Sequence, residues 1–232
     1  TTFSAEINDF EHQWKACLSY LQAKNLITLY ASQLWLNAKQ QIKSSQSMDD
    51  RSLYWARLLS SKIIRNNKPK FAIKPLEIKA LLNRLEQGSR GRTELEYTHK
   101  TDKKILLTGF DPFLLDRHIN QSNPSGVAAL LLDNKVITYK GITAEINTVM
   151  VPVRYQDFDE GTIETLLAPY FALNNVDMVV TVSMGRKDFD LEHFPGKRRS
   201  VTAPDNANIL SGGTQSAPVV PKLHNHALPG QE

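Results

Sequence analysis

The sequence lacks most of the features that would assign a compartment or a cofactor directly. Cys17 is the only cysteine, which excludes an intrachain disulfide. No apolar stretch approaches the roughly 20 residues that a membrane-spanning helix needs, so no membrane association is expected. The net charge is only +4 and the basic residues are scattered, so nucleic-acid binding is not expected either. His224 and His226 are spaced like two metal ligands on a strand, but no third ligand follows, so we expect neither metal nor cofactor.

What the sequence does contain is typical of a globular protein with a substantial core. Of its 232 residues, 41% are hydrophobic and 22% are charged, and this length is enough for two domains. The first residue is Thr1 and not Met, which leaves open a secreted or periplasmic protein whose signal has been removed. The oligomeric state is also open, and a homo-oligomer is one of the alternatives.

Residues 1–88 are expected to form an all-helical, bundle-like module. Apolar residues recur at spacings of three and four along four segments, which places them on one face of each helix. The expected helices are Phe3–Gln22, Leu26–Lys43, a third that is capped by Asp49 or Asp50 and runs to Ile64, and Pro75–Gly88. Cys17 lies on the apolar face of the first helix, so its thiol is interpreted as a buried structural group and not as a nucleophile. The module either packs on the rest of the chain and shapes access to it, or binds a partner protein.

The remainder of the chain predicts a linker followed by an α/β domain. Residues 89–103 contain glycine and many charges and are interpreted as the linker. Residues 104–232 alternate between strand-like and helix-like segments, which predicts a largely parallel sheet with helices on both sides. Asn123 is suited to cap a helix that begins at Pro124. The continuous apolar run Met178–Met184 predicts a strand buried on both faces.

The chain is organised around the stretch Lys103–Phe113, with the sequence KKILLTGFDPF. Its short apolar run, stopped by glycine and proline, predicts a buried strand that leads into a loop. In open α/β sheets, ligands bind beside the loops that leave the carboxyl ends of the strands. Phe110 and Phe113 lie in this loop, where they either plug the edge of the sheet or line a binding site.

Four motifs follow one another in this half of the chain. They are T-G-F-D-P-F after the apolar strand, Asn123-Pro124-Ser125, the strand Val179–Ser183 followed by Gly185-Arg186, and Pro204-Asp205-Asn206. In order and spacing they resemble the pyroglutamyl peptidase I family, also called pyrrolidone-carboxylate peptidase. Glu192 matches the position of the family's catalytic glutamate. The resemblance covers Lys103–Glu232, and the helical module has no counterpart in it.

The resemblance implies a fold, an activity and a set of site residues. The implied fold is a three-layer α/β/α sandwich of the phosphorylase/hydrolase-like type. The implied activity is that of a cytoplasmic cysteine peptidase that removes pyroglutamate from the N-terminus of a peptide substrate. Glu192 would orient the catalytic histidine. Phe110, Phe113 and Asn123 would bind the substrate, with the two phenylalanines as walls of the pyrrolidone-ring pocket.

The chain departs from the family at several positions. The family's nucleophilic cysteine and its histidine are expected beyond residue 232, because neither Cys17 nor His224 matches their motifs. The chain is therefore expected to be the N-terminal part of a longer peptidase. Around the expected pocket, Leu114-Leu115 replaces two glycines and the loop that follows is longer.

Two other classes of function remain as alternatives. A non-catalytic relative would keep the fold and act as a binding or scaffold protein through the helical module. A different hydrolase or phosphorylase on a similar sheet would need a phosphate-binding glycine loop, and the sequence contains none.

Overall fold

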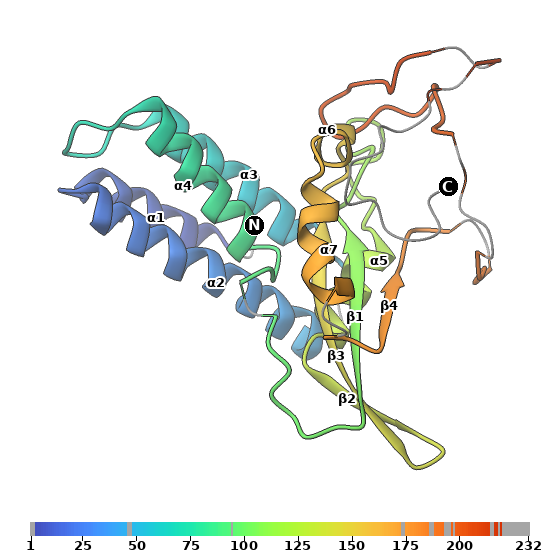
Figure 1. Ribbon diagram of the computed structural model, residues 1–232. Helices are drawn as coiled ribbons and strands as arrows, with labels where there is room; N and C mark the ends of the chain where they lie inside the picture. The colour runs from blue at the N-terminus through green and yellow to red at the C-terminus, as the bar shows by residue number, and fades with distance from the viewer. Residues whose placement is uncertain are drawn as a thin grey trace.

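The computed structural model describes residues 3–45, 48–93, 95–172, 175–185, 188–192, 196, 198–213, 216–217 and 219. Within these residues, four helices come first, and three more helices then accompany the strands of one sheet (Figure 1). The helices are α1 (Ser4–Ala16), α2 (Tyr20–Ser45), α3 (Arg51–Asn66), α4 (Pro75–Gly88), α5 (Pro124–Leu132), α6 (Tyr155–Asp159) and α7 (Thr162–Ala172). The strands are β1 (Lys103–Phe110), β2 (Lys135–Tyr139), β3 (Ile142–Val151) and β4 (Met178–Thr181). The chain is broadly α/β, as predicted.

The sheet is mixed and not uniformly parallel. Its strand order is β2-β3-β1-β4, with β1 parallel to both β3 and β4, and with β2 antiparallel to β3. Lys140 and Gly141 connect β2 to β3 at φ values of 50° and 81°. Positive φ at both central residues is typical of the tightest β-hairpin turn, and such a short connection can only join antiparallel strands.

The prediction that Met178–Met184 is a strand buried on both faces is wrong. The strand extends only over Met178–Thr181, with one further backbone bond from Val182 to the carbonyl of Thr108 at 2.9 Å, and Met178 is 55% exposed. Among the described strands, β4 has β1 as its single neighbour, so it lies at the edge of this part of the sheet. Apolar composition indicated a strand correctly, but burial depends on what packs against it.

The first predicted helix also ends too late. It stops at Ala16, and α2 begins at Tyr20. The break is local, because the Ser19 hydroxyl accepts the backbone N–H of Gln22 at 3.2 Å and so caps the start of α2. In contrast, α4 begins at Pro75 and ends at Gly88 as predicted.

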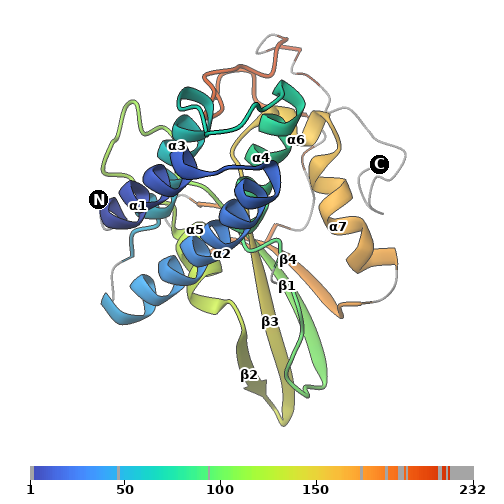
Figure 2. The same cartoon turned by 90° about the vertical axis from the view of Figure 1, so that its left-hand side faces the viewer.

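The hydrophobic core of α1–α4 continues into the sheet-bearing part of the chain. Trp14 and Trp35 are fully buried in the helical part, and Val127 of α5 and Met150 of β3 belong to the same cluster. Helix α5 contacts α2 on one side and β1 and β3 on the other, and Figure 2 shows it beside α2. The helical part is therefore positioned against the sheet through α5.

Candidate functional site

A cavity of about 380 Å³ lies at the carboxyl end of β1. This is the place where ligands bind in open α/β sheets, and the volume falls in the usual range for small-molecule sites. Both Phe110 and Phe113 line it, together with Pro204 and Asp205 of the motif Pro204-Asp205-Asn206. The other lining residues are Leu114, Arg117, Val153, Arg154, Tyr155, Phe158, Thr202 and Ala203.

The segment that carries Asp205 and Asn206 is tied to the ends of the two central strands. The Asn206 side-chain amide donates to the carbonyl of Pro112 at 2.8 Å, and its backbone N–H donates to the carbonyl of Val153 at 2.9 Å. The Asp205 carboxylate accepts the backbone N–H of Tyr155 at 3.0 Å. These bonds hold residues 202–206 against the loop that carries the two phenylalanines.

The Asp205 carboxylate also organises its own loop. Its Oδ1 accepts the backbone N–H groups of Ala207 at 2.8 Å and Ile209 at 3.0 Å. The side chain is almost fully buried, and each oxygen has a partner. Asp205 therefore shapes the cavity wall by fixing backbone, which is a common role of Asp in turns.

Leu114 is held in a conformation that glycine favours. Its φ is 57°, in the left-handed region where a Cβ atom is unfavourable by about 1–2 kcal/mol. The side chain lines the cavity beside Phe113. Residues kept in such conformations cluster at binding sites, where the surrounding structure imposes them.

Two arginines line the cavity, and one of them is paired with carboxylates. Arg154 donates to Asp157 at 2.7 Å and lies 3.4 Å from a carboxylate oxygen of Glu86. Burial disfavours the charge on Arg154, but the hydrogen bonds to Asp157 and the charge of Glu86 outweigh it and raise its pKa. Arg117 is exposed at the rim and has no ion-pair partner in the part of the chain that the structure describes.

Asp111, which lies between the two phenylalanines, forms ion pairs with Arg57 of the helical part and with Arg90 just after it. Asp111 pairs with Arg57 of α3 at 2.9 Å and with Arg90 at 2.8 Å, and all three side chains are buried. Arg57 also donates to the hydroxyl and the carbonyl of Ser89, each at 2.9 Å. Residues 89–103 were predicted to be a linker, but the segment begins with two buried residues that belong to this network.

Asn123 has a structural position behind the cavity. Its side-chain oxygen accepts the backbone N–H of Ser125 at 3.0 Å and so caps α5, as predicted. Its amide donates to the carbonyl of Asp111 at 2.9 Å. Asn123 is 1% exposed and is not among the residues that line the cavity. It supports the loop between the phenylalanines, and a direct contact with substrate stays a prediction.

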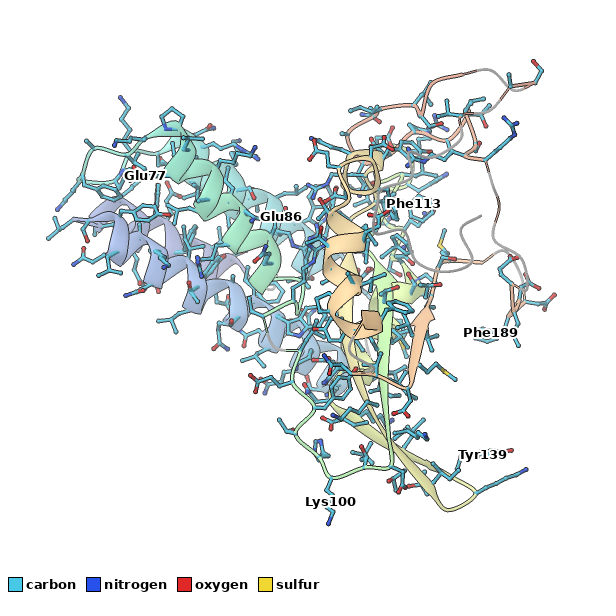
Figure 3. All side chains as sticks on the ribbon, in the orientation of Figure 1. Glu77, Glu86, Lys100, Phe113, Tyr139 and Phe189 are labelled. Atoms are coloured by element: carbon cyan, nitrogen blue, oxygen red, sulfur yellow. The ribbon has the colours of Figure 1, made fainter. Side chains whose placement is uncertain are left out.

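Glu192 is not brought to the cavity by the structure. Its side chain is exposed, and it is not one of the lining residues. Figure 3 shows Phe189, three residues earlier in the chain, well apart from Phe113. The neighbouring residues 193–195 lie outside the described part of the chain, as do Arg186, His224 and His226. The catalytic role of Glu192 therefore stays a prediction.

A second cavity, of about 240 Å³, adjoins the first and was not predicted from the sequence. The two cavities share Leu114 and Asp205. Tyr54 and Trp55 of α3 form part of its lining. No sequence signal places α3 beside the loop after β1, because their meeting depends on how the helical part docks.

The described residues offer few other candidate sites. They include no group of three or more histidine, cysteine, aspartate or glutamate side chains that could hold a metal ion. Across the same residues, no helix combines the length and the apolar character needed to cross a membrane.

The fold and the cavity define an α/β protein with a ligand-sized site at the carboxyl ends of its parallel strands. The chain belongs to the PA0049 family. The model of the family's C-terminal domain matches residues 104–230, more than half of the chain, and the model of its N-terminal domain matches residues 1–86.

A relative from Pseudomonas aeruginosa, the uncharacterized protein PA0049, is 28% identical to the chain over 235 residues. The match covers 91% of this chain and 41% of the relative, so the chain spans about two-fifths of that protein's length. No solved structure matches the chain. Neither the descriptions of the family models nor the name of the relative states an activity.

Proposed function

We propose that this chain supplies the substrate-binding part of a cysteine peptidase that removes pyroglutamate from the N-terminus of peptides. The observation that carries the proposal is that Phe110 and Phe113 line one cavity with Pro204 and Asp205. These residues belong to motifs far apart in the sequence, and both motifs contribute to the resemblance to pyroglutamyl peptidase I. A shared cavity is what a common substrate site requires.

The chemistry of the cavity suits a pyroglutamyl ring. The ring is small, flat and mostly apolar, and it needs aromatic or aliphatic walls with a few polar groups at its lactam edge. Phe110, Phe113 and Phe158 supply aromatic walls, and Arg117 and Thr202 supply polar side chains. A lactam amide left without a partner would be costly to bury, so these polar groups matter as much as the rings.

The same walls disfavour peptides with a free amino terminus. An N-terminal ammonium would lose its hydration inside the cavity and would lie near the positive charge of Arg117, for which the described residues provide no ion-pair partner. Pyroglutamate carries no such charge, because its nitrogen belongs to the lactam. The proposed site therefore selects blocked N-termini by excluding the charged alternative.

The nucleophile is proposed to lie in the full-length protein outside this chain. Cys17 is 6% exposed, its thiol donates to the carbonyl of Gln13 at 3.3 Å, and burial raises its pKa. A peptidase thiol needs the opposite environment, one that lowers its pKa. In the proposal, Glu192 orients the histidine that activates the nucleophile.

The proposal includes the finer fold and the domain limits. It assigns residues 1–88 to a helical domain, 89–103 to a connection and 104–232 to a three-layer α/β/α sandwich. Support for the third layer comes from Figure 2, where α5 and α7 lie on opposite sides of the strands. The two parallel strand pairs on either side of β1 are compatible with that fold.

The test is an assay of the full-length protein with a fluorogenic pyroglutamyl amide, and with the matching prolyl amide as control. We expect hydrolysis of the pyroglutamyl amide only, loss of kcat in Glu192→Gln, and a higher KM in Phe113→Ala. As a matched control, Glu160→Gln replaces an exposed glutamate outside the cavity lining and should change neither constant. Full-length protein that neither binds nor cleaves the pyroglutamyl amide would contradict the proposal.

A second candidate is a non-catalytic relative that binds a partner through the helical part. The observation that favours it is a row of exposed leucines on one side of α2, formed by Leu21, Leu29 and Leu36. In that case the full-length protein would show no pyroglutamyl amidase activity. The substitution Leu29→Glu would abolish binding of the partner protein without lowering the melting temperature.

A further inference from the structure

The second cavity combines residues of the helical part, which has no counterpart in the pyroglutamyl peptidase resemblance, with residues at which the chain departs from that family. Tyr54 and Trp55 come from the helical part, and Leu114, Leu115 and Asp116 come from the loop after β1. The remaining lining residues, Asp205, Asn206 and Asn208, come from the segment that closes the first cavity. The two cavities therefore form adjoining parts of one binding region.

The aromatic side of the second cavity is well defined. The rings of Tyr54 and Trp55 lie 5.3 Å apart at an angle of 69°, in an edge-to-face contact. Both side chains are half-buried, so each keeps some surface free for a ligand. The faces of such rings attract cations, tryptophan most strongly.

The charges of the two cavities differ in sign. Asp205 lines both cavities, but the first cavity also contains Arg117 and Arg154, whereas the second contains the further carboxylate of Asp116 and no basic side chain. Asp205 uses its oxygens on backbone N–H groups, but the exposed Asp116 has neither a hydrogen bond nor an ion pair within the described ranges. A free carboxylate beside aromatic rings fits a ligand with a positive charge on an extended apolar stem.

We propose that the second cavity binds the side chain of the residue that follows pyroglutamate, and that it selects lysine or arginine. This inference rests on the proposed function, because the first cavity must hold the pyroglutamyl ring. Leu114 and Asp205 are shared by both cavities, so a dipeptide can place its ring in one and its second side chain in the other. The helical part of the chain thereby becomes a specificity element of the site.

The experiment measures binding of two neutral-ended probes to the full-length protein by calorimetry. Pyroglutamyl-lysinamide carries the charge, and pyroglutamyl-norleucinamide has a similar apolar stem without it. One cation–π contact and one exposed ion pair together predict about tenfold tighter binding of the lysine probe. In Asp116→Asn this preference should fall to about threefold or less, while the affinity for the norleucine probe stays unchanged. Asp9→Asn, an exposed aspartate on α1, is the matched control and should keep the full preference.

A second measurement locates the probe. We expect Trp55→Phe to remove the part of the fluorescence change on binding that comes from the second cavity, because Trp55 lines this cavity whereas Trp14 and Trp35 are fully buried. Equal binding of both probes would overturn the subsite inference and leave the proposed function standing. Failure of both probes to bind would overturn the proposed function together with the inference.

Discussion

Arg57 and Asp111 form a buried ion pair of 2.9 Å that joins α3 to the loop between Phe110 and Phe113. Each side chain is 1% exposed, and the second carboxylate oxygen of Asp111 is paired with Arg90 at 2.8 Å. Since Asp111 directly follows Phe110, the helical part of the chain fixes the backbone on which the cavity wall is built.

Removal of the Asp111 carboxylate should unfold the region that carries the cavity. In Asp111→Ala, two buried guanidinium groups lose their shared partner, which we expect to destabilise the protein by about 3–5 kcal/mol. Thermal or urea unfolding followed by circular dichroism measures the effect. The control is Asp177→Asn, which breaks an exposed 2.8 Å pair with Lys103 and should leave the melting temperature unchanged. Equal melting temperatures for the two variants would mean that the buried pair does not hold the loop.

The sequence predicts features that depend on neighbouring residues better than features that depend on residues far apart in the chain. Asn123 and Pro124 start α5 as predicted, because capping depends on neighbouring residues alone. The cap that Ser19 provides for the backbone N–H of Gln22 is equally local, but the apolar periodicity of this region favours one continuous helix and hides the break. In contrast, the second cavity depends on the contact between Arg57 and Asp111, which lie 54 residues apart, and no local pattern encodes it.

Any side chain at Gly109 is predicted to destabilise the protein. A Cβ atom at this position would lie 2.2 Å from the backbone oxygen of Ser125, where α5 crosses the end of β1. Gly109→Ala must push α5 away, and overpacking of this kind costs about 1–3 kcal/mol. We expect a lower melting temperature and a higher KM, because Phe110 moves with its neighbour.

The control for this variant is Gly196→Ala. Among the described residues, the nearest heavy atom to a new Cβ at that position would be 3.9 Å away, so these residues leave room for alanine. If Gly109→Ala melts at the same temperature as Gly196→Ala, then α5 and β1 are not packed as closely as the structure shows.

Asp50 should make the stability depend on pH in the neutral range. Burial, together with the nearby charge of Asp111, raises the pKa of this carboxyl from 3.8 to about 7. Between these two pKa values the folded protein holds a proton that the unfolded chain releases, so the contribution of Asp50 to stability is greatest below about pH 4 and falls as the pH rises to about 7. Asp50→Asn removes this loss and still offers an oxygen to the backbone N–H of Asn123, which Asp50 accepts at 2.9 Å.

We therefore expect Asp50→Asn to raise the stability at pH 8 by on the order of 3 kcal/mol and to change it little at pH 4. Its neighbour provides a control of opposite sign. Hydrogen bonds from Arg51 lower the pKa of Asp49, so Asp49→Asn should lower the free energy of unfolding at pH 8. Denaturant titrations of both variants at the two pH values measure this, and an Asp50→Asn curve parallel to that of the unmodified protein would contradict the prediction.

Leu114 allows binding to be separated from stability. Its φ of 57° is unfavourable for leucine and ordinary for glycine, and its side chain lines both cavities. In Leu114→Gly the relief of backbone strain offsets part of the cost of the lost apolar contacts and of the greater freedom of the unfolded chain, so the stability should fall by only about 1 kcal/mol. In Leu114→Ala the strain remains and the apolar contacts are lost, so this variant should be the less stable of the two. Both variants should bind pyroglutamyl-lysinamide more weakly and to a similar extent, since both lack the side chain that separates the two cavities. A Leu114→Gly protein that binds the probe as well as the unmodified protein would show that the strained leucine serves the fold and not the ligand.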